Sequence, residues 1–255
     1  MILSILSSSG CQVPVEVRLA NTDEEVEKAL RLRYQVFVED ERADLENDSH
    51  IEMDKFDQYC HHLIVKRLDT QEVIGTYRLL LGLKAIGGIG LYSEEEFDLA
   101  FFRPWLPYTV ELGRSCVMPE WRGGRVISLL WEGIARYVLE HNVKYLVGCA
   151  SISKSSLNNL DEIYSYLKQN YNFNNMIIKP RSLYKVENLK EVPLITEEKR
   201  LFRQLPPLIK GYLRAGAKIC GEPAFDPVFN TIDFFLIFDR SKIVNKYKQN
   251  YLQVI

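Results

Sequence analysis

Apolar residues recur along this chain with two different periods, and the order in which the periods alternate limits the folds open to it. Residues 15–19 alternate apolar and polar side chains, which predicts a half-buried strand, and residues 22–38 carry apolar residues at helical spacing. Glu25 follows Thr22 by three positions, which predicts a capping box at the start of that helix. Residues 62–81 hold two strand-like runs around a polar hairpin turn.

The remainder of the chain continues this alternation and ends on a strand. The expected elements are strands at 108–117, 145–152, 218–220 and 231–238 and helices at 125–141, 157–170 and 207–214. A polar, irregular segment at 179–207 precedes the last helix. This order predicts a mixed central sheet flanked by helices, in the α/β (α+β) class.

Length and composition fit one folded domain. The chain has 255 residues, of which 47% are hydrophobic and 26% are charged. Its net charge of −2 gives no field that would attract nucleic acid, so no nucleic-acid partner is expected. We expect a single domain over residues 14–240, with 1–13 and 241–255 as terminal extensions. No run of 18 apolar residues is present, so no transmembrane helix is expected.

The chain has five cysteines, Cys11, Cys60, Cys116, Cys149 and Cys220. Their odd number and wide spacing predict reduced thiols in a cytoplasmic protein rather than a disulfide framework. Cys60, Cys116 and Cys149 lie in or beside apolar strands, so we expect them in the core. The mildly apolar start lacks a basic segment, which favours a loose or first-strand N-terminus; a lipidated Cys11 is the alternative.

Charged residues occur inside strands that are otherwise apolar. Arg78 lies in one of them, and Glu111 and Arg114 lie in the next. Unpaired buried charge is costly, so three such charges indicate a paired or functional group. Residues three apart in a regular strand face opposite sides. We therefore expect a β-bulge near Gly113 that brings Glu111 and Arg114 to one cleft and frees backbone N–H groups for a ligand.

Two further segments carry candidate binding residues. The first is an acidic loop at 39–59, with Arg33 in the helix before it. The second is the turn Arg122-Gly123-Gly124-Arg125-Val126, which leads from a strand into an amphipathic helix. Glycines let a ligand approach the backbone, and the free N–H groups of a helix start attract anions, so this turn fits a phosphate.

Together these residues resemble the N-acyl-homoserine-lactone synthases, which belong to the GNAT-like acyltransferases. The shared pattern is Arg33 and Phe37, then Asp54 and Asp57, then Arg78, then Glu111 and Arg114. Segments 111–117, 123–131, 211–218 and 221–235 are more similar to the ornithine Nα-acyltransferases and the related N-acylglycine synthases, often labelled hemolysin-like. The resemblance covers about residues 15–240 and implies a GNAT-like acyltransferase fold.

The resemblance implies an N-acyltransferase. It would move a long-chain (3-hydroxy)acyl group from a thioester to the α-amine of a small amino acid such as ornithine or glycine, making an N-acyl amino acid or lyso-ornithine lipid. The acyl-phosphopantetheine thioester, on acyl carrier protein or coenzyme A, would be a co-substrate, with no permanently bound cofactor and no metal. The turn lacks the second small residue of the usual coenzyme A loop, which favours acyl carrier protein as the partner.

On this reading Glu111 is the candidate base for the attacking amine, and a backbone N–H near Cys116 or Val117 would hold the oxyanion. Asp54 and Asp57 would bind a cationic amine.

Arg33 has two interpretations: it binds the substrate carboxylate, or it pairs with Asp54 or Asp57. We expect Arg78 and Arg114 to hold the acidic loop and Phe37 to serve the core more than the site. The turn from Arg122 to Val126 would receive the donor.

Two alternatives stay open. One is a homoserine-lactone synthase that uses S-adenosylmethionine, although residues 38–44 lack the Trp that those synthases carry. The other is a non-enzymatic, hemolysin-like or binding protein, although no exposed amphipathic membrane helix is evident. We expect a cytoplasmic protein, and peripheral contact with the inner membrane surface also stays open.

Overall fold

The computed structural model of the protein describes residues 2–6, 11–41, 43–157 and 159–242. They form a large mixed sheet with the order β1-β2-β3-β4-β6-β7-β11-β10, and β9 also pairs with β11. Its strands are β1 (Ile2–Leu6), β2 (Gln12–Leu19), β3 (His61–Arg67), β4 (Val73–Leu81), β6 (Thr109–Val117), β7 (Tyr145–Ser153), β9 (Lys218–Ile219), β10 (Ala224–Asp226) and β11 (Thr231–Asp239). A separate small sheet joins β5 (Phe97–Asp98) to β8 (Lys179–Pro180).

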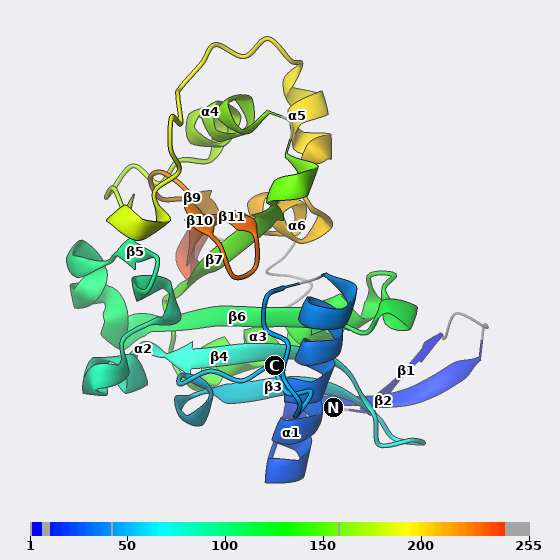
Figure 1. The fold of residues 1–255 in the computed structure, drawn as a ribbon. Helices are drawn as coiled ribbons and strands as arrows, with labels where there is room; N and C mark the ends of the chain where they lie inside the picture. Colours follow the sequence, from blue (N-terminus) through cyan, green and yellow to red (C-terminus); the bar gives the residue numbers. More distant parts are fainter. Residues whose placement is uncertain (1, 7–10, 42, 158, 243–255) are drawn as a thin grey trace.

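Helices pack on both faces of the large sheet, with α1 in front of it and α3 behind it in Figure 1. The helices are α1 (Asp23–Tyr34), α2 (Gly82–Lys84), α3 (Arg125–Glu140), α4 (Leu160–Tyr171), α5 (Glu198–Gln204) and α6 (Pro207–Ala215). Side chains of β3 alternate between the two faces of the sheet. Ile64 packs on the face covered by α1, whereas Leu63 and Val65 pack on the face covered by α3. The predicted mixed sheet flanked by helices is confirmed.

The start of α1 departs from the predicted capping box in one respect. The Oγ1 of Thr22 accepts a hydrogen bond from the N–H of Glu25 at 3.2 Å, as expected. The carboxylate of Glu25 does not return to Thr22. It accepts instead from the N–H of Asn21 at 3.1 Å and pairs with Arg18 and Lys66. A π-helical turn over residues 35–40 then extends the helix towards the acidic loop.

The sheet parts between β6 and β7. These strands run parallel and pair only over a short stretch, from Thr109 opposite Tyr145 to Glu111 opposite Val147. Beyond it β6 stays with β4 and β7 stays with β11, and Figure 1 shows β7 turning away from β6. Gly148 stands where the strands separate: a Cβ at this position would lie 2.3 Å from the carbonyl oxygen of Leu112.

The expected bulge in β6 is present. The register with β4 shifts between Thr76 and Arg78, so that Arg114 and Ser115 together face a single residue of β4. Arg114 has φ of +50°. As a result Glu111 and Arg114, which would face opposite sides of a regular strand, line the same cavity.

Other elements differ from the expectations in detail. Residues 2–6 lie outside the expected domain bounds of 14–240, and they form the edge strand β1, which pairs with β2, as the first-strand interpretation of the N-terminus expected. The expected extension at 241–255 lies outside the described residues from 243 onwards. The irregular segment at 179–207 contains β8 and the short helix α5. Within the described residues, no helix combines the length and apolarity needed to cross a membrane.

Candidate active site

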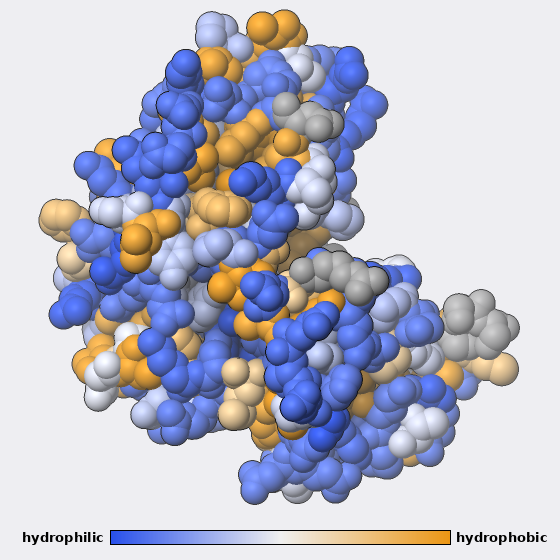
Figure 2. Space-filling model, viewed as in Figure 1, coloured by the Kyte–Doolittle hydropathy of each residue, from blue (hydrophilic) through white to orange (hydrophobic). Residues whose placement is uncertain are grey.

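A large cavity of about 680 Å³ lies beside the opening between β6 and β7. Its walls are mainly apolar and come from α3, β7, α6 and β11: Ile127, Trp131, Ile134, Val138, Leu146, Leu208 and Phe238. Figure 2 shows apolar surface in the recess between the part of the molecule that holds α5 and α6 and the part that holds α1. Such a volume and lining are typical of a site for a largely apolar ligand.

The Gly-Gly turn borders this cavity, as do two residues of β6. Arg122, Gly123 and Gly124 line it at the start of α3, and Cys116 and Val117 line it from the sheet. Gly124 precedes the first residue of α3 and has φ of +95°, a conformation that favours glycine. These five residues of the predicted donor site therefore face a common space.

Arg122 also forms an ion pair, and the two remaining donor residues, Arg125 and Val126, do not line the larger cavity. The Nη2 of Arg122 donates to Asp40 at 2.7 Å, and Arg125 lies 3.5 Å from Glu132, while both arginines stay about half exposed. Val126 is 1% exposed and packs in the main core cluster. Its side chain is thus a core residue, because it points into the sheet rather than into the cavity.

A smaller cavity of about 310 Å³ adjoins the first. Glu41, Ser115 and Leu208 line both cavities, which therefore meet at the bulged part of β6. Phe37 lines the smaller one, where its ring packs edge-on against Phe229 at 5.8 Å. Its polar lining includes Tyr77, Arg78, Tyr92, Glu111, Arg114, Ser151, Tyr212, Asp226, Thr231 and Asp233.

Glu111 is buried and faces the smaller cavity. Its Oε1 accepts from the N–H of Ser93 at 2.8 Å and from the Ser93 hydroxyl at 2.5 Å, and its Oε2 accepts from the N–H of Tyr92 at 2.7 Å. Burial raises the pKa of Glu111, and these hydrogen bonds oppose the rise. A carboxylate with a raised pKa at a cavity wall is suited to accept a proton.

Three arginines and three carboxylates form a closed ring below the cavity. Each carboxylate joins two arginines: Glu52 joins Arg33 and Arg114, Asp54 joins Arg114 and Arg78, and Asp57 joins Arg78 and Arg33. Burial alone would raise the pKa of Asp57, but hydrogen bonds and charge from Arg33 and Arg78 hold it well below its usual range. The ring has no net charge and ties the acidic loop to α1, β4 and β6.

This pairing bears on three residues expected at the substrate. Arg33 is fully buried and bonded to Glu52 and Asp57, so it has no face open to a substrate carboxylate. Asp54 and Asp57 accept from arginines and loop N–H groups, and neither is among the residues that line the two cavities. Because the charges of the ring neutralise one another, Arg33, Asp54 and Asp57 hold the acidic loop in place and have no free charge to offer a substrate. Arg78 and Arg114 lie as expected, holding the loop.

A second acidic group lies at the smaller cavity: Asp226 and Asp233 line it, and the carboxylate of Glu96 is buried within 4.8 Å of that of Asp233 without lining the cavity itself. It consists of Glu96 from the loop before β5, Asp226 from β10 and Asp233 from β11. Burial raises the pKa of Asp233 to about 6, helped by the charge of Asp226. Burial also raises the pKa of Glu96 well above its usual range, helped by the charges of Asp233 and Asp226.

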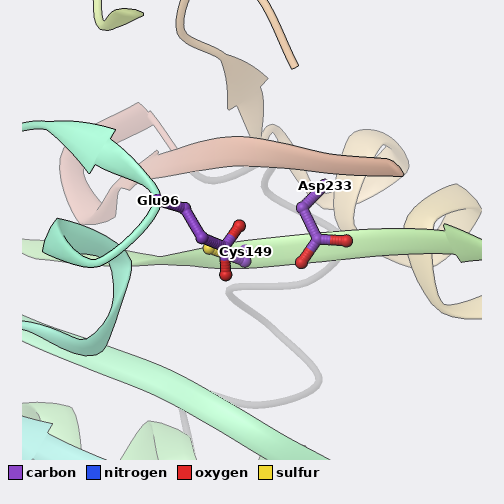
Figure 3. A group of neighbouring side chains, drawn as sticks. All are labelled: Glu96, Cys149 and Asp233. Atoms are coloured by element: carbon purple, nitrogen blue, oxygen red, sulfur yellow. The ribbon is translucent and has the colours of Figure 1, made fainter. Parts of the chain in front are cut away.

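Glu96, Cys149 and Asp233 could in principle hold a metal ion, because their ligand atoms all lie within 4.8 Å of one another (Figure 3). The donor set is a thiol with two carboxylates. Burial and the charge of Glu96 raise the pKa of the Cys149 thiol well above its usual range, which works against the thiolate that a metal would need. The sequence had suggested only a core role for Cys149.

Residues that the sequence analysis did not single out complete the smaller cavity. Tyr77 and Tyr212 hydrogen-bond through their hydroxyls, and burial raises the pKa of both. Asp226 and Asp233 fall in the segment 221–235 that carried the family resemblance, but no role followed from it. Asp233 also carries a charge within an apolar strand, the signal that identified Arg78.

Comparison with known proteins places this geometry in a family. A family model described as an acetyltransferase (GNAT) domain matches residues 32–132. The L-ornithine N(alpha)-acyltransferase of Brucella abortus is 35% identical over 254 residues, covering 93% of this chain and 88% of the relative. The glycine N(alpha)-acyltransferase of Bacteroides thetaiotaomicron is 30% identical over 196 residues, covering 64% of this chain and 58% of the relative.

The fold has a solved counterpart. The CoA-dependent acyl-homoserine lactone synthase BjaI, solved with SAM and isopentyl-CoA, superposes with a TM-score of 0.52 at 13% identity, covering 94% of this chain and 91% of that chain. At that identity the likeness concerns the fold alone. Together with the long, well-covered match in sequence, it shows that the chain belongs to the family of L-ornithine Nα-acyltransferases and is an acyltransferase with a GNAT fold.

Proposed function

We propose that this protein transfers a long-chain acyl group, including 3-hydroxyacyl groups, from a thioester to the α-amine of an amino acid such as ornithine or glycine. The observation that carries the proposal is the pair of cavities that meet at the bulge of β6. One is large and apolar, as an acyl chain requires, and the other is smaller and more polar, as an amino acid requires. The named relatives act on ornithine and glycine.

The reaction would join the two substrates where the cavities meet. The acceptor amine loses a proton to Glu111, directly or through water, and its nitrogen attacks the thioester carbonyl carbon. The C–N bond forms, the C–S bond breaks, and the thiolate leaves with a proton returned from Glu111. The bulge leaves an extra residue of β6 outside the ladder with β4, and we assign the oxyanion to a backbone N–H between Ser115 and Val117.

Acyl carrier protein is our proposed donor. Arg122 and Arg125 stay about half exposed beside the turn that borders the larger cavity, where they could meet an acidic carrier surface. Gly123 and Gly124 leave open space for the single phosphate of a phosphopantetheine arm, because a Cβ at either position would meet no atom within 4 Å. We place the reaction in the cytoplasm, at or near the inner membrane surface.

The test is a purified transfer assay read by mass spectrometry. The protein is supplied with long-chain acyl carrier protein or the matching acyl-CoA, and with ornithine, glycine or S-adenosylmethionine. We expect N-acyl amino acid from the carrier-protein donor, with kcat about 10²–10⁴-fold lower for Glu111→Gln. Glu72→Gln in the β3–β4 hairpin is the matched control and should retain full activity. An acyl lactone formed from S-adenosylmethionine, or no acyl amide with any amino acid, would overturn the proposal.

A further inference from the structure

Within the described residues, no salt bridge joins Glu96, Asp226 or Asp233 to a cation. Arg114 is the arginine whose charge acts on Glu96 and Asp233, but it is hydrogen-bonded to Glu52 and Asp54 in the neutral ring. Negative charge therefore remains in excess beside the smaller cavity. Buried carboxylates in excess are costly unless a ligand or a proton compensates them.

Glu96 shows this lack of a partner most directly. The residue is 1% exposed, and within the described residues neither of its carboxylate oxygens accepts from an N–H or hydroxyl group; the thiol of Cys149, a weak donor, lies beside it. Figure 3 shows its carboxylate directed towards Asp233, over Cys149. The loop is held in this position, because the N–H of Arg181 donates to the carbonyl of Glu96 at 2.7 Å and Arg181 Nε donates to the carbonyl of Glu94 at 2.6 Å.

The remaining acceptor positions suit a primary ammonium group. One oxygen of Asp233 accepts from the Thr231 hydroxyl at 2.6 Å, and one oxygen of Asp226 accepts from the N–H of Val228 at 2.7 Å. Ser151 also hydrogen-bonds Asp233, but each carboxylate oxygen can accept more than one hydrogen bond, so all three carboxylates keep acceptor positions. An ammonium group carries three N–H donors and a full charge, which matches acceptors supplied from three sides.

The group also lies close to the proposed base. The Ser93 hydroxyl donates to Glu111 at 2.5 Å, and the thiol of Cys149 lies 3.4 Å from the same hydroxyl oxygen. The ligand atom of Cys149 is in turn within 4.8 Å of those of Glu96 and Asp233. Two small side chains therefore separate the site of amine attack from the acidic group, a separation suited to the short aliphatic chain of a diamino acid.

We propose that Glu96 and Asp233, assisted by Asp226, bind the side-chain ammonium of a diamino acid acceptor such as ornithine. This assignment rests on the N-acyl transfer proposed above and makes these carboxylates the determinants of acceptor choice. Glycine and other neutral acceptors would leave the carboxylates uncompensated, so they would bind more weakly. Glu111 serves the α-amine, and the acidic group serves the second amine.

The experiment compares two acceptors that differ only in the terminal amine: ornithine and norvaline. Wild type, Glu96→Gln, Asp233→Asn and the matched control Glu95→Gln are assayed with one long-chain acyl thioester, and kcat and KM are measured for each acceptor. Glu95 is the neighbour of Glu96 but pairs with the exposed Lys55 at 2.7 Å, outside the cavity. Melting curves accompany each variant, because removal of an uncompensated buried charge should leave the fold intact.

We expect wild type and Glu95→Gln to prefer ornithine. Glu96→Gln and Asp233→Asn should raise KM for ornithine by about 10- to 100-fold, the loss of one charge-assisted hydrogen bond. The values of kcat with both acceptors, and of KM for norvaline, should stay close to those of wild type. Glu96→Asp should recover part of the preference, because it restores the charge.

Three results would overturn the assignment. The first is an unchanged ornithine preference in both variants. The second is an equal fall of kcat with both acceptors, which would make Glu96 part of the proton transfer. The third is a stoichiometric metal ion in wild type that is required for activity and lost in Glu96→Gln. These outcomes differ from failure of the N-acyl transfer itself, in which wild type would acylate neither acceptor.

Discussion

Replacing Arg33 by methionine should open the ring of three arginines and three carboxylates. The side chain of Arg33 is fully buried and bonds Glu52 and both oxygens of Asp57. Methionine fills a similar volume without the charge. The variant leaves Glu52 with Arg114 alone and Asp57 with Arg78 alone, so one negative charge stays buried without compensation.

The structure gives the size of the effect. Removing one partner from a buried ion pair costs about 3–5 kcal/mol, because the remaining charge is left in a poorly solvated place. For a chain of this size each kcal/mol lowers the melting temperature by roughly 2–4 °C, so we expect a fall of about 6–20 °C. The double variant Arg33→Met/Asp57→Asn should be less destabilised than the two single changes added together, because it removes the unpaired charge.

Urea unfolding at neutral pH, followed by circular dichroism, measures this prediction. Arg31→Met is the matched control on the same helix, since Arg31 is 49% exposed and pairs with Glu27 four positions earlier. Exposed pairs contribute less than about 1 kcal/mol, so this control should unfold near wild type. If Arg33→Met were no less stable than Arg31→Met, or if it changed only KM for the acceptor, the supporting role of the ring would be refuted.

Three more predictions concern the cavities. Gly148→Ala should lower the free energy of unfolding by about 1–3 kcal/mol in the same assay, because the added Cβ would lie 2.3 Å from the Leu112 carbonyl oxygen. An unchanged midpoint of urea unfolding would contradict this contact. Gly211→Leu fills open space at the wall of the larger cavity, so kcat/KM for long acyl chains should fall about 10-fold or more, whereas kcat/KM for short acyl chains should not change. An equal loss for long and short acyl chains would show that the acyl chain binds elsewhere. The pKa of Asp233 is raised to about 6, so the folded state favours its protonated form. The resulting contribution to the free energy of unfolding is complete below pH 4 and is lost as the pH rises through 6. Asp233→Asn should therefore gain roughly 1–3 kcal/mol over wild type between pH 4 and pH 7.5, and a pH-independent difference in urea unfolding would refute the shift.

The sequence predicted the framework of the site well, because its signals were local. Arg78, Glu111 and Arg114 were identifiable since charge is rare inside apolar strands, and the bulge followed from the spacing of Glu111 and Arg114. The same reasoning applied to 231–238 would have found Asp233. The sequence left Arg33 with two interpretations, and only the packed structure shows that pairing within the protein satisfies it.

Glu96 could not be identified from the sequence. It follows Glu94 and Glu95 in a loop without periodicity, where three successive acidic residues are indistinguishable. Its burial depends on contacts far along the chain, including the N–H of Arg181 and the strand that carries Asp233. Such tertiary contacts, rather than local pattern, decide which of the three glutamates faces water and which is buried beside Asp233.

The meeting of the two cavities at Glu41, Ser115 and Leu208 has a consequence for turnover. In the reaction proposed above, the finished amide would have its acyl chain in one cavity and its amino-acid head in the other, so both ends of the product would contact the enzyme. A molecule anchored twice dissociates more slowly than either half alone. We expect the departure of product, aided by a lipid surface that accepts the tail, to limit the rate rather than bond formation.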